Sequence, residues 1–321
     1  MEIMKAADAS SGKDDVRIID IPKPIPKSGE VVVQVECSAV EDGEEQVLRK
    51  TWVGKFLHRN TTPLILGWNI AGIVDSVGPG VDLVKGDPVW GHLDFSPFQK
   101  QGSYSEYVVM RSNAVAKRPE GLAAAEAASF ATTGLTALQA IRKYGGLKPG
   151  KVLLVIGAGG GIGGVAVGLG KKLGAEVIAV CSTKDIDKVK LRGADRIIDR
   201  KKEDFIQSGV KVDVILDTPS KYTFGQCSGL LNRGGTYVDL HPWTLLAGYF
   251  QALFSGKRCR FAQVQSKRDD LDLLGQWISN GLELPITVES RFPVRNLGDA
   301  LKQRLNPSRS GAIVVDVKGG W

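Results

Sequence analysis

The sequence predicts an α/β protein in which a doubly wound parallel sheet is joined to a β-rich domain. Short strands rich in β-branched residues fill the first 120 residues, and strands alternate with helices from about residue 124. A glycine-rich loop joins one apolar strand to the helix after it. The 321 residues suffice for two domains. We expect the β-rich domain at 1–123, the parallel sheet at 124–265 and a return to the first domain at 266–321.

The first domain shows short apolar runs separated by turn residues. Strands are expected at 31–35, 70–74 and 104–110, with turns such as Lys27-Ser28-Gly29-Glu30 and Gly78-Pro79-Gly80 around them. Close spacing of short strands is typical of a compact, barrel-like β-domain.

The pattern changes from successive strands to alternating strands and helices after a helix expected over 124–144. Lys148-Pro149-Gly150 ends this helix. Strands are then expected at 152–156, 176–180, 196–198, 212–216 and 236–240, with a sixth at 258–265. The intervening helices are expected at 162–173, 185–192, 203–208 and 224–231. The chain then predicts a helix at 269–279, a strand at 287–289, a helix at 296–305 and a strand at 312–317. The first strand of the series, VLLVI, is apolar throughout, as a strand covered on both faces should be.

Composition and charge exclude several protein classes. The chain is 43% hydrophobic and 24% charged, which is ordinary for a globular protein. The net charge of +7 is uneven: residues 1–120 carry 14 basic and 17 acidic groups, and the remainder carries 28 and 18. The basic half suits an anionic cofactor, a nucleic acid or merely a solvated surface. No RNA- or DNA-binding motif accompanies the charge, so we expect no nucleic-acid partner.

The four cysteines lie at least 32 residues apart, with no CxxC spacing, so a disulfide framework is not expected. The N-terminus has no apolar signal core, and the most apolar late stretch, 243–254, is too short to span a bilayer. We therefore expect a cytoplasmic protein without a membrane span.

The glycine loop, residues 157–164, predicts a dinucleotide site. Glycines let the turn adopt positive φ and let backbone N–H groups approach a pyrophosphate at a helix N-terminus. Two registers fit: Gly159-x-Gly161-x-x-Gly164 and Gly157-x-x-Gly160-x-x-Gly163.

The cofactor is predicted from the end of the second strand, where an NAD site carries an acid. This chain has Cys181-Ser182-Thr183-Lys184 there, with Lys188 and Arg200 nearby. Hydroxyl groups and cations suit a 2′-phosphate, so NADPH is expected. Asp185 is the one nearby acid that argues for NADH.

The order of these parts resembles the medium-chain dehydrogenase/reductase superfamily, and within it the zinc-independent quinone oxidoreductase branch, notably the reticulon-4-interacting protein 1-like members. The resemblance covers nearly the whole chain. The segments that carry it are PIPKSGEVVV at 24–33, Gly67-x-x-x-Ala71-Gly72-Ile73-Val74, GDPVW at 86–90, QGSYSEYVV at 101–109, GLTA at 134–137, the glycine loop and Gly193-Ala194-Asp195. It implies a GroES-like catalytic domain and a Rossmann domain.

The resemblance also implies roles for individual residues. Phosphate-loop contacts match Gly160, Gly161, Ile162 and Gly163. The 2′-phosphate contacts match Ser182 and Lys188, with Arg200 where the family has Tyr, and Thr183 beside them is a further cofactor-binding candidate. The nicotinamide is expected near Asp217, Thr218, Leu240 and His241, facing Thr133.

Zinc-dependent relatives carry a Cys and a His-Glu pair where this chain has Glu41 and Trp68-Asn69. Three ligands are needed for catalytic zinc, and His58, His92 and His241 would form such a site only by coincidence, so no metal is expected.

The quinone reductase branch usually has Asn and Asp where this chain has Glu41 and Asn69. Glu41 is either a buried proton donor with a raised pKa or a solvated residue at a helix start. A flat apolar substrate pocket is expected from Trp52, Trp68, Asn69 and Phe95, although aromatic residues are more often core.

These features predict an NADPH-dependent oxidoreductase that transfers hydride to a quinone or an α,β-unsaturated carbonyl without zinc. The candidate catalytic residues are Glu41, Thr133 and His241. The alternative is an impaired NADPH-binding sensor or scaffold of the same fold. A homodimer is expected through the sixth strand, 258–265, because a terminal strand exposes unpaired backbone groups.

Overall fold

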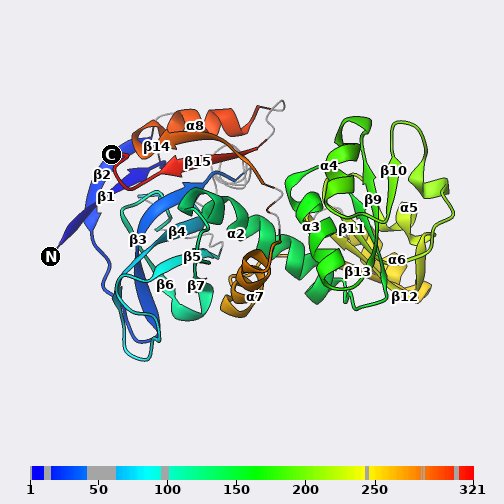
Figure 1. The fold of residues 1–321 in the computed structure, drawn as a ribbon, viewed down its shortest axis with the longest axis horizontal. Coiled ribbons are helices and arrows are strands. Elements are labelled where there is room, and N and C mark those ends of the chain that lie inside the picture. The colour runs from blue at the N-terminus through cyan, green and yellow to red at the C-terminus, as the bar shows by residue number, and fades with distance from the viewer. Residues whose placement is uncertain are drawn as a thin grey trace. The chain divides into compact units, whose positions relative to one another are not determined.

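A computed structural model describes residues 2–10, 16–41, 63–94, 101–242, 246–282, 284, 286–306 and 311–321. The chain divides into two compact units (Figure 1). Unit 1 holds residues 1–132 and 265–321, and unit 2 holds residues 133–264. The division falls inside helix α2 (Ala124–Gln139), because this helix begins in unit 1 and continues into unit 2.

Unit 2 contains a six-stranded sheet in the order β10-β9-β8-β11-β12-β13. All five neighbouring pairs are parallel, which confirms the predicted doubly wound sheet. The strands are β8 (Val152–Ile156), β9 (Glu176–Cys181), β10 (Arg196–Asp199), β11 (Val212–Asp217), β12 (Leu231–Asp239) and β13 (Arg258–Phe261). The order reverses between β8 and β11, and ligands of such sheets bind beyond the carboxyl ends at this point.

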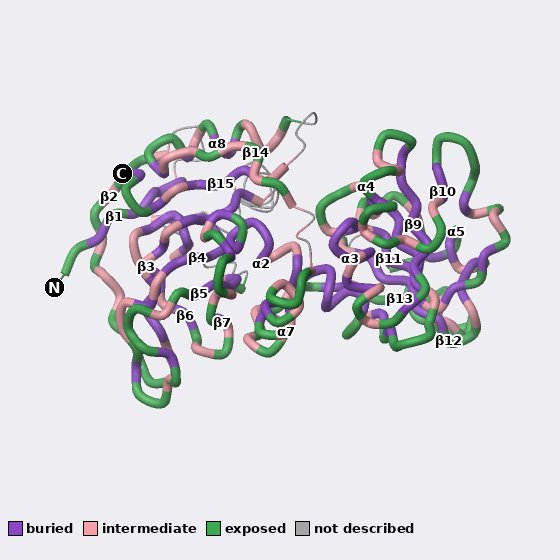
Figure 2. The backbone as a smooth tube through the Cα atoms, viewed as in Figure 1, coloured by how far each residue is buried: buried purple, intermediate pink, exposed green. Residues whose placement is uncertain are grey.

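Local sequence explains why these elements form and where the expectations were wrong. Residues 153–156 of β8 are buried, as Figure 2 shows for the central strands. The helices are α3 (Gly161–Lys172), α4 (Ile186–Leu191), α5 (Phe224–Ser228) and α6 (Leu246–Ser255). The helix expected at 203–208 is only a 3₁₀ turn, Phe205–Gln207, because Asp204 caps it and Gly209 follows at φ +68°.

Unit 1 is β-rich, as expected, and the C-terminal segment completes its sheet. The order is β14-β15-β3-β4-β5-β7, with β6 also paired to β3 and a separate β1–β2 pair. The strands are β1 (Ile3–Asp8), β2 (Arg17–Pro22), β3 (Glu30–Ala39), β4 (Asn69–Val77), β5 (Pro88–His92), β6 (Tyr107–Arg111), β7 (Val115–Lys117), β14 (Val288–Pro293) and β15 (Ala312–Asp316). Helices α7 (Arg268–Ser279) and α8 (Leu297–Arg304) also belong to this unit.

The core of unit 1 includes buried residues of β3 and β4, namely Val31, Val33, Val35, Ile70 and Val74. Trp90 stacks on Phe130 at 6.2 Å between ring centroids. All four cysteines are buried free thiols. Among the described residues, no helix combines the length and apolarity needed to cross a membrane.

Candidate cofactor site and neighbouring polar clusters

The glycine loop joins β8 to α3 in a conformation that depends on glycine at defined positions. Gly157 has φ +81°, and a Cβ there would lie 2.5 Å from the Thr218 hydroxyl oxygen. A Cβ on Gly163 would lie 2.3 Å from the Gly157 carbonyl oxygen. These two glycines are therefore required by the close packing of the loop on itself and on the end of β11.

Gly160 and Gly161, in contrast, are exposed at the N-terminus of α3. A Cβ on Gly160 would lie 3.3 Å from the Gly157 carbonyl oxygen, whereas a Cβ on Gly161 would meet no atom nearer than 3.9 Å, which belongs to Thr133. Among the described residues, no side chain caps this helix end. The first-turn N–H groups and the helix dipole favour a bound anion at such a position. The loop thus fits a pyrophosphate in the second predicted register, with Gly160 and Gly161 open to a ligand and Gly163 packed inside.

The end of β9 carries hydroxyl groups that already donate to carboxylates. Ser182 donates to Asp185 at 2.6 Å, and Thr183 donates to Asp199 at 2.7 Å. A Cβ on Gly159 would lie 2.5 Å from the carboxyl carbon of Asp185, so this acid lies against the glycine loop. The acid that argued for NADH from the sequence is therefore at the predicted dinucleotide site.

Cations surround the same loop. Arg192 follows α4, donates to the Ala158 carbonyl at 3.1 Å and fills the space beside Gly164. Burial lowers the pKa of Arg192, and the nearby Asp185 charge opposes that shift. Lys188 and Arg200, the predicted phosphate ligands, are exposed. Sequence reasoning missed Arg192; its position just before Gly193-Ala194-Asp195 was the available signal.

Asp217 and Thr218 end β11 with their polar groups turned into the protein. Asp217 is fully buried and accepts from the Tyr222 N–H at 3.0 Å and the Tyr237 hydroxyl at 2.9 Å. Burial raises the pKa of Asp217, and the Tyr222 and Tyr237 hydrogen bonds oppose that rise. Thr218 donates to the Ile156 carbonyl at 2.9 Å. These hydrogen bonds fix the conformation of the chain at the carboxyl end of β11.

His241 follows β12 and joins a polar cluster at the same edge. Its Nδ1 lies 2.6 Å from the Ser220 hydroxyl oxygen, and that hydroxyl also donates to Asp239. The His241 backbone N–H donates to Asp239 at 2.9 Å. Asp239 is fully buried, His241 is exposed and Leu240 between them is half-buried.

Unit 1 holds a second polar network, built around Asn69 at the start of β4. The Asn69 amide donates to Glu41 at 2.9 Å and to the Ala39 carbonyl at 3.2 Å. Its carbonyl oxygen accepts from both the N–H and the hydroxyl of Thr132, at 3.0 and 2.6 Å. The Thr132 hydroxyl oxygen lies 2.7 Å from Nδ1 of His92. Sequence reasoning named Glu41 and Asn69 here but gave Thr132 no role.

The environment of this network determines its charges. Burial lowers the pKa of His92 to about 4, so the ring is neutral at pH 7. The second carboxylate oxygen of Glu41 lies 3.9 Å from Arg304. Across the part of the chain that the structure describes, no three His, Cys, Asp or Glu side chains form a group that would hold a metal ion.

The predicted substrate pocket is only partly covered by the described residues. Trp68 is half-buried and packs against the core of unit 1. Trp52 and Phe95 lie outside the described residues. Thr133, the candidate on the linking helix, lies beside Gly161 in unit 2, as given above.

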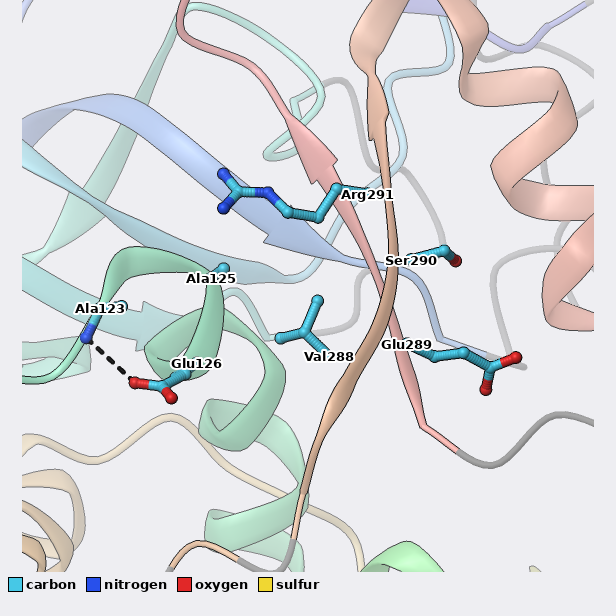
Figure 3. Close-up of a pocket in the computed structure, with 7 residues that line it drawn as sticks. All are labelled: Ala123, Ala125, Glu126, Val288, Glu289, Ser290 and Arg291. Carbon is cyan, nitrogen blue, oxygen red and sulfur yellow. Dashed lines mark hydrogen bonds between the residues drawn. The ribbon is translucent and has the colours of Figure 1, made fainter.

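A cavity of about 520 Å³ opens in unit 1 beside the start of α2 and strand β14 (Figure 3). No predicted site residue lines it; the lining residues are Ala123, Ala125, Glu126, Val288, Glu289, Ser290 and Arg291. Glu126 accepts from the Ala123 N–H at 3.2 Å and so caps α2, and Arg291 pairs with Asp316. These polar side chains serve the fold.

Comparison with known families identifies both parts of the chain. A family described as "Alcohol dehydrogenase GroES-like domain" matches residues 27–120, and one described as "Zinc-binding dehydrogenase" matches residues 192–315. The quinone oxidoreductase of Coxiella burnetii has a solved structure similar to this one, with a TM-score of 0.82 and 25% identity over 98% of this chain and all of that one.

Individual relatives are similar over most of the chain. A chloroplast envelope quinone oxidoreductase homolog of Arabidopsis thaliana is 30% identical over 93% of both chains. The mitochondrial NAD(P)H oxidoreductase RTN4IP1 of Homo sapiens is 32% identical over 79% of this chain and 71% of its own length. The trans-enoyl reductase pgmF of Aspergillus terreus is 30% identical over 91% of this chain and 87% of its own.

Proposed function

The chain belongs to the quinone oxidoreductase branch of the medium-chain dehydrogenase/reductase superfamily, and we propose that it is an NADPH-dependent reductase of quinones or α,β-unsaturated carbonyls. Membership makes it an oxidoreductase with a nicotinamide cofactor. The observation that carries the proposal is the N-terminus of α3, where Gly160 and Gly161 are exposed, Gly161 borders open space, and no described side chain caps the helix. The names of two relatives, a quinone oxidoreductase and a trans-enoyl reductase, support the substrate classes.

The cofactor, when bound, supplies a hydride from C4 of its dihydronicotinamide ring. We assign its pyrophosphate to the backbone of Gly160, Gly161, Ile162 and Gly163, because helix N-termini bind anions through their N–H groups. Thr133 lies beside this turn, which supports a role for it toward the same ligand.

NADPH is the cofactor that we propose, on the basis of charge. Lys188 and Arg200 are exposed cations after the second and third strands, and Arg192 adds a third cation beside the loop. Charge-assisted bonds from such groups favour a 2′-phosphate. Ser182 and Thr183 belong to the same proposed site, but each must turn its proton from a carboxylate to the phosphate.

Reduction of the two substrate classes places different demands on the protein. Hydride transfer to a quinone gives a delocalised oxyanion, whereas hydride transfer to an enone gives an enolate that must gain a proton. We propose Glu41, Thr133 and His241 as the candidate catalytic residues, and Trp52, Trp68, Asn69 and Phe95 as substrate-pocket residues. The part-buried hydrogen bond from Asn69 to Glu41 supports a carboxyl group held in one orientation.

We further propose that catalysis needs no zinc. The positions at which zinc-dependent relatives have a Cys and a His-Glu pair are Glu41, Trp68 and Asn69 in this chain. The Asn69 side chain donates to Glu41 and to the Ala39 carbonyl and accepts from Thr132. These hydrogen bonds to protein groups support a structural role for Asn69 at this position and not a role as a metal ligand.

The direct test is oxidation of NADPH and of NADH by the purified protein with a panel of quinones and enones. We expect turnover with at least one class and a higher kcat/KM for NADPH. Binding of neither cofactor in a calorimetric titration would overturn the proposal. Tighter binding of NADH would overturn only the cofactor preference.

A second candidate is an NADPH-binding sensor or scaffold that has lost catalysis. The observation that favours it is the double contact of Glu41, which accepts from Asn69 and lies 3.9 Å from Arg304. These contacts are also consistent with Glu41 serving as a structural partner of Asn69 and Arg304 instead of a proton donor. NADPH binding without turnover on any substrate of the panel would identify this alternative.

We also propose that the protein is a cytoplasmic homodimer paired through the outer edge of β13. This strand ends the sheet of unit 2, and α6 beside it exposes apolar side chains such as Phe250 and Phe254. The Ala262 N–H donates to the Asp239 carbonyl within the sheet, so the outward N–H groups belong to alternate residues such as Phe261.

The dimer is tested by light scattering of variants at Phe261. We expect a mass near twice 34.5 kDa for the native chain and for Phe261→Ala, but not for Phe261→Pro, which lacks the outward N–H donor. A native mass near 34.5 kDa would overturn the proposal.

A further inference from the structure

Ser220 connects a buried carboxylate to an exposed imidazole at the carboxyl edge of the unit 2 sheet. Its hydroxyl donates to Oδ1 of Asp239, the last residue of β12, and its oxygen lies 2.6 Å from Nδ1 of His241. Asp239 is fully buried and also accepts the His241 backbone N–H at 2.9 Å. Ser220 therefore holds the His241 ring through Nδ1, and Asp239 holds the backbone of the same residue.

The directions of these hydrogen bonds determine the tautomer of His241. An ionised carboxylate can only accept hydrogen bonds, so the single proton of the Ser220 hydroxyl points to Asp239. The Ser220 oxygen can then only accept from the ring, which requires a proton on Nδ1 of His241. Any proton that this imidazole exchanges with a ligand consequently passes through Nε2.

The backbone of Ser220 supports a functional reason for this arrangement. With φ +51°, it is the only non-glycine residue with positive φ within the described ranges, where fifteen glycines adopt such angles. A serine is strained in this region, and glycine would remove the strain. Strained residues cluster at functional sites, because the surrounding contacts hold them in place. The hydroxyl is what serine provides and glycine does not.

We infer that Ser220 is a positioning residue that keeps the Nδ1 proton of His241 in place, so that Nε2 is the nitrogen that takes up a proton from water and then delivers it to the reduced substrate. The inference rests on the proposed function and names the proton donor for enones. Ligands of doubly wound sheets bind beyond this carboxyl edge, which is where His241 lies.

The step balances as follows for an enone. The hydride carries an electron pair to the β-carbon and forms the new C–H bond, which leaves an enolate and the oxidised cofactor. The His241 imidazolium then releases its Nε2 proton to the α-carbon, and the saturated carbonyl compound forms. The ring becomes neutral with its remaining proton on Nδ1, bonded to Ser220, and water returns a proton to Nε2.

The decisive variant is Ser220→Gly, because it removes the hydroxyl while it relieves the backbone strain. Long-range ¹⁵N–¹H spectra of the native protein should show His241 as the Nδ1–H tautomer, whereas Ser220→Gly and Ser220→Ala should shift it toward the Nε2–H tautomer. His241→Gln and His92→Asn assign the signals. A native Nε2–H tautomer, or one unchanged by both Ser220 variants, would overturn the inference.

Activity provides a second, independent readout. We expect Ser220→Gly to lower kcat for enone reduction at least about tenfold and kcat for quinone reduction less than about twofold, because the hydroquinone anion takes its proton on oxygen directly from water, whereas the enolate needs a positioned acid at carbon. NADPH affinity should not change. Equal losses with both substrates would overturn the proton delivery. A native protein that binds no nicotinamide cofactor would overturn the proposed function, and the tautomer spectra would then still decide whether Ser220 orients His241.

Discussion

Two polar clusters of this protein use similar groups in opposite environments. In unit 1, Asn69 and Thr132 lead from Glu41 to Nδ1 of His92, whose exposed fraction is 2%. In unit 2, Ser220 leads from the buried Asp239 to Nδ1 of His241, which is exposed. In each, a hydroxyl donates to an oxygen acceptor and faces a histidine nitrogen.

The difference in burial separates the two histidine rings. Burial lowers the pKa of His92 to about 4, so this ring is neutral at pH 7. His241 is exposed. Similar hydrogen bonds thus fix a buried ring beside the candidate residues Glu41 and Asn69 in unit 1, whereas in unit 2 we infer that they orient an exposed ring toward a ligand.

The largest expected effect is at Asn69. Replacing it with Ala removes one partner each from the part-buried Thr132 N–H, the Thr132 hydroxyl and Glu41. Each lost hydrogen bond costs about 1 kcal/mol, so we expect the free energy of unfolding to fall by about 3 kcal/mol. Urea denaturation measures the change. Asn280→Ala, at an exposed position in the same unit, is the control and should stay within about 0.5 kcal/mol. A small effect at Asn69 would contradict the structural role of this network.

The pH dependence of stability should show the effect of burying His92. The pKa of His92 is lowered in the folded state, so the unfolded chain binds its proton first as pH falls. Stability is then lost from about pH 6.5 down to about pH 4, by at most about 3 kcal/mol from this residue. Denaturation of the native protein and of His92→Asn at pH 7, 5.5 and 4 measures it. The variant should lose less stability over this range; a parallel decline would show that His92 is not the cause.

The glycine loop tests which backbone positions of unit 2 face a ligand. Gly163→Ala forces a methyl group against the Gly157 carbonyl and should lower the free energy of unfolding by about 2 kcal/mol. Gly161→Ala meets open space, so it should leave stability nearly unchanged but weaken cofactor binding about tenfold or more. Thermal unfolding and calorimetric titration distinguish the two. Full cofactor affinity in Gly161→Ala would exclude this turn as the pyrophosphate site.

Removing the cations near the glycine loop should have a smaller effect, limited to the affinity for NADPH. Lys188→Ala and Arg200→Ala should each weaken NADPH binding by about 1.5 kcal/mol and leave NADH binding unchanged, because only NADPH carries the 2′-phosphate. Asp185→Asn should strengthen NADPH binding, since its carboxylate lies against Gly159. Lys172→Ala, at the far end of α3, is the matched control. Equal losses for both cofactors would contradict the assignment.

Metal removal should have no measurable effect. Because Glu41 and Asn69 bind each other where zinc-dependent relatives hold their ligands, chelator should leave any reductase activity intact. Elemental analysis should find no stoichiometric zinc. One zinc per chain, or loss of activity that zinc restores, would show that the unit 1 network does not replace a metal centre.

The sequence by itself determined the fold class and the position of the glycine loop. Apolar runs such as VLLVI at 152–156 predict buried parallel strands because their periodicity is local, and β8 has these bounds. The glycine loop was recognisable because the glycines that a dinucleotide site requires all fall within eight consecutive residues, 157–164, and so form one local motif. Turns were less predictable: residues 203–208 carry a helical composition, but Asp204 and Gly209 limit them to one turn.

Only the tertiary structure decided which polar side chains meet. Thr132 is 63 residues from Asn69 and 40 from His92, and Ser220 is 21 from His241. Asp185 and Arg192 lie in the connection between β9 and β10, and both contact the glycine loop. Local periodicity shows which face of a strand or helix is buried, but hydrogen-bond partners depend on strand order, register and side-chain direction. These are properties of the packed chain, and they make Ser220 the residue that orients His241.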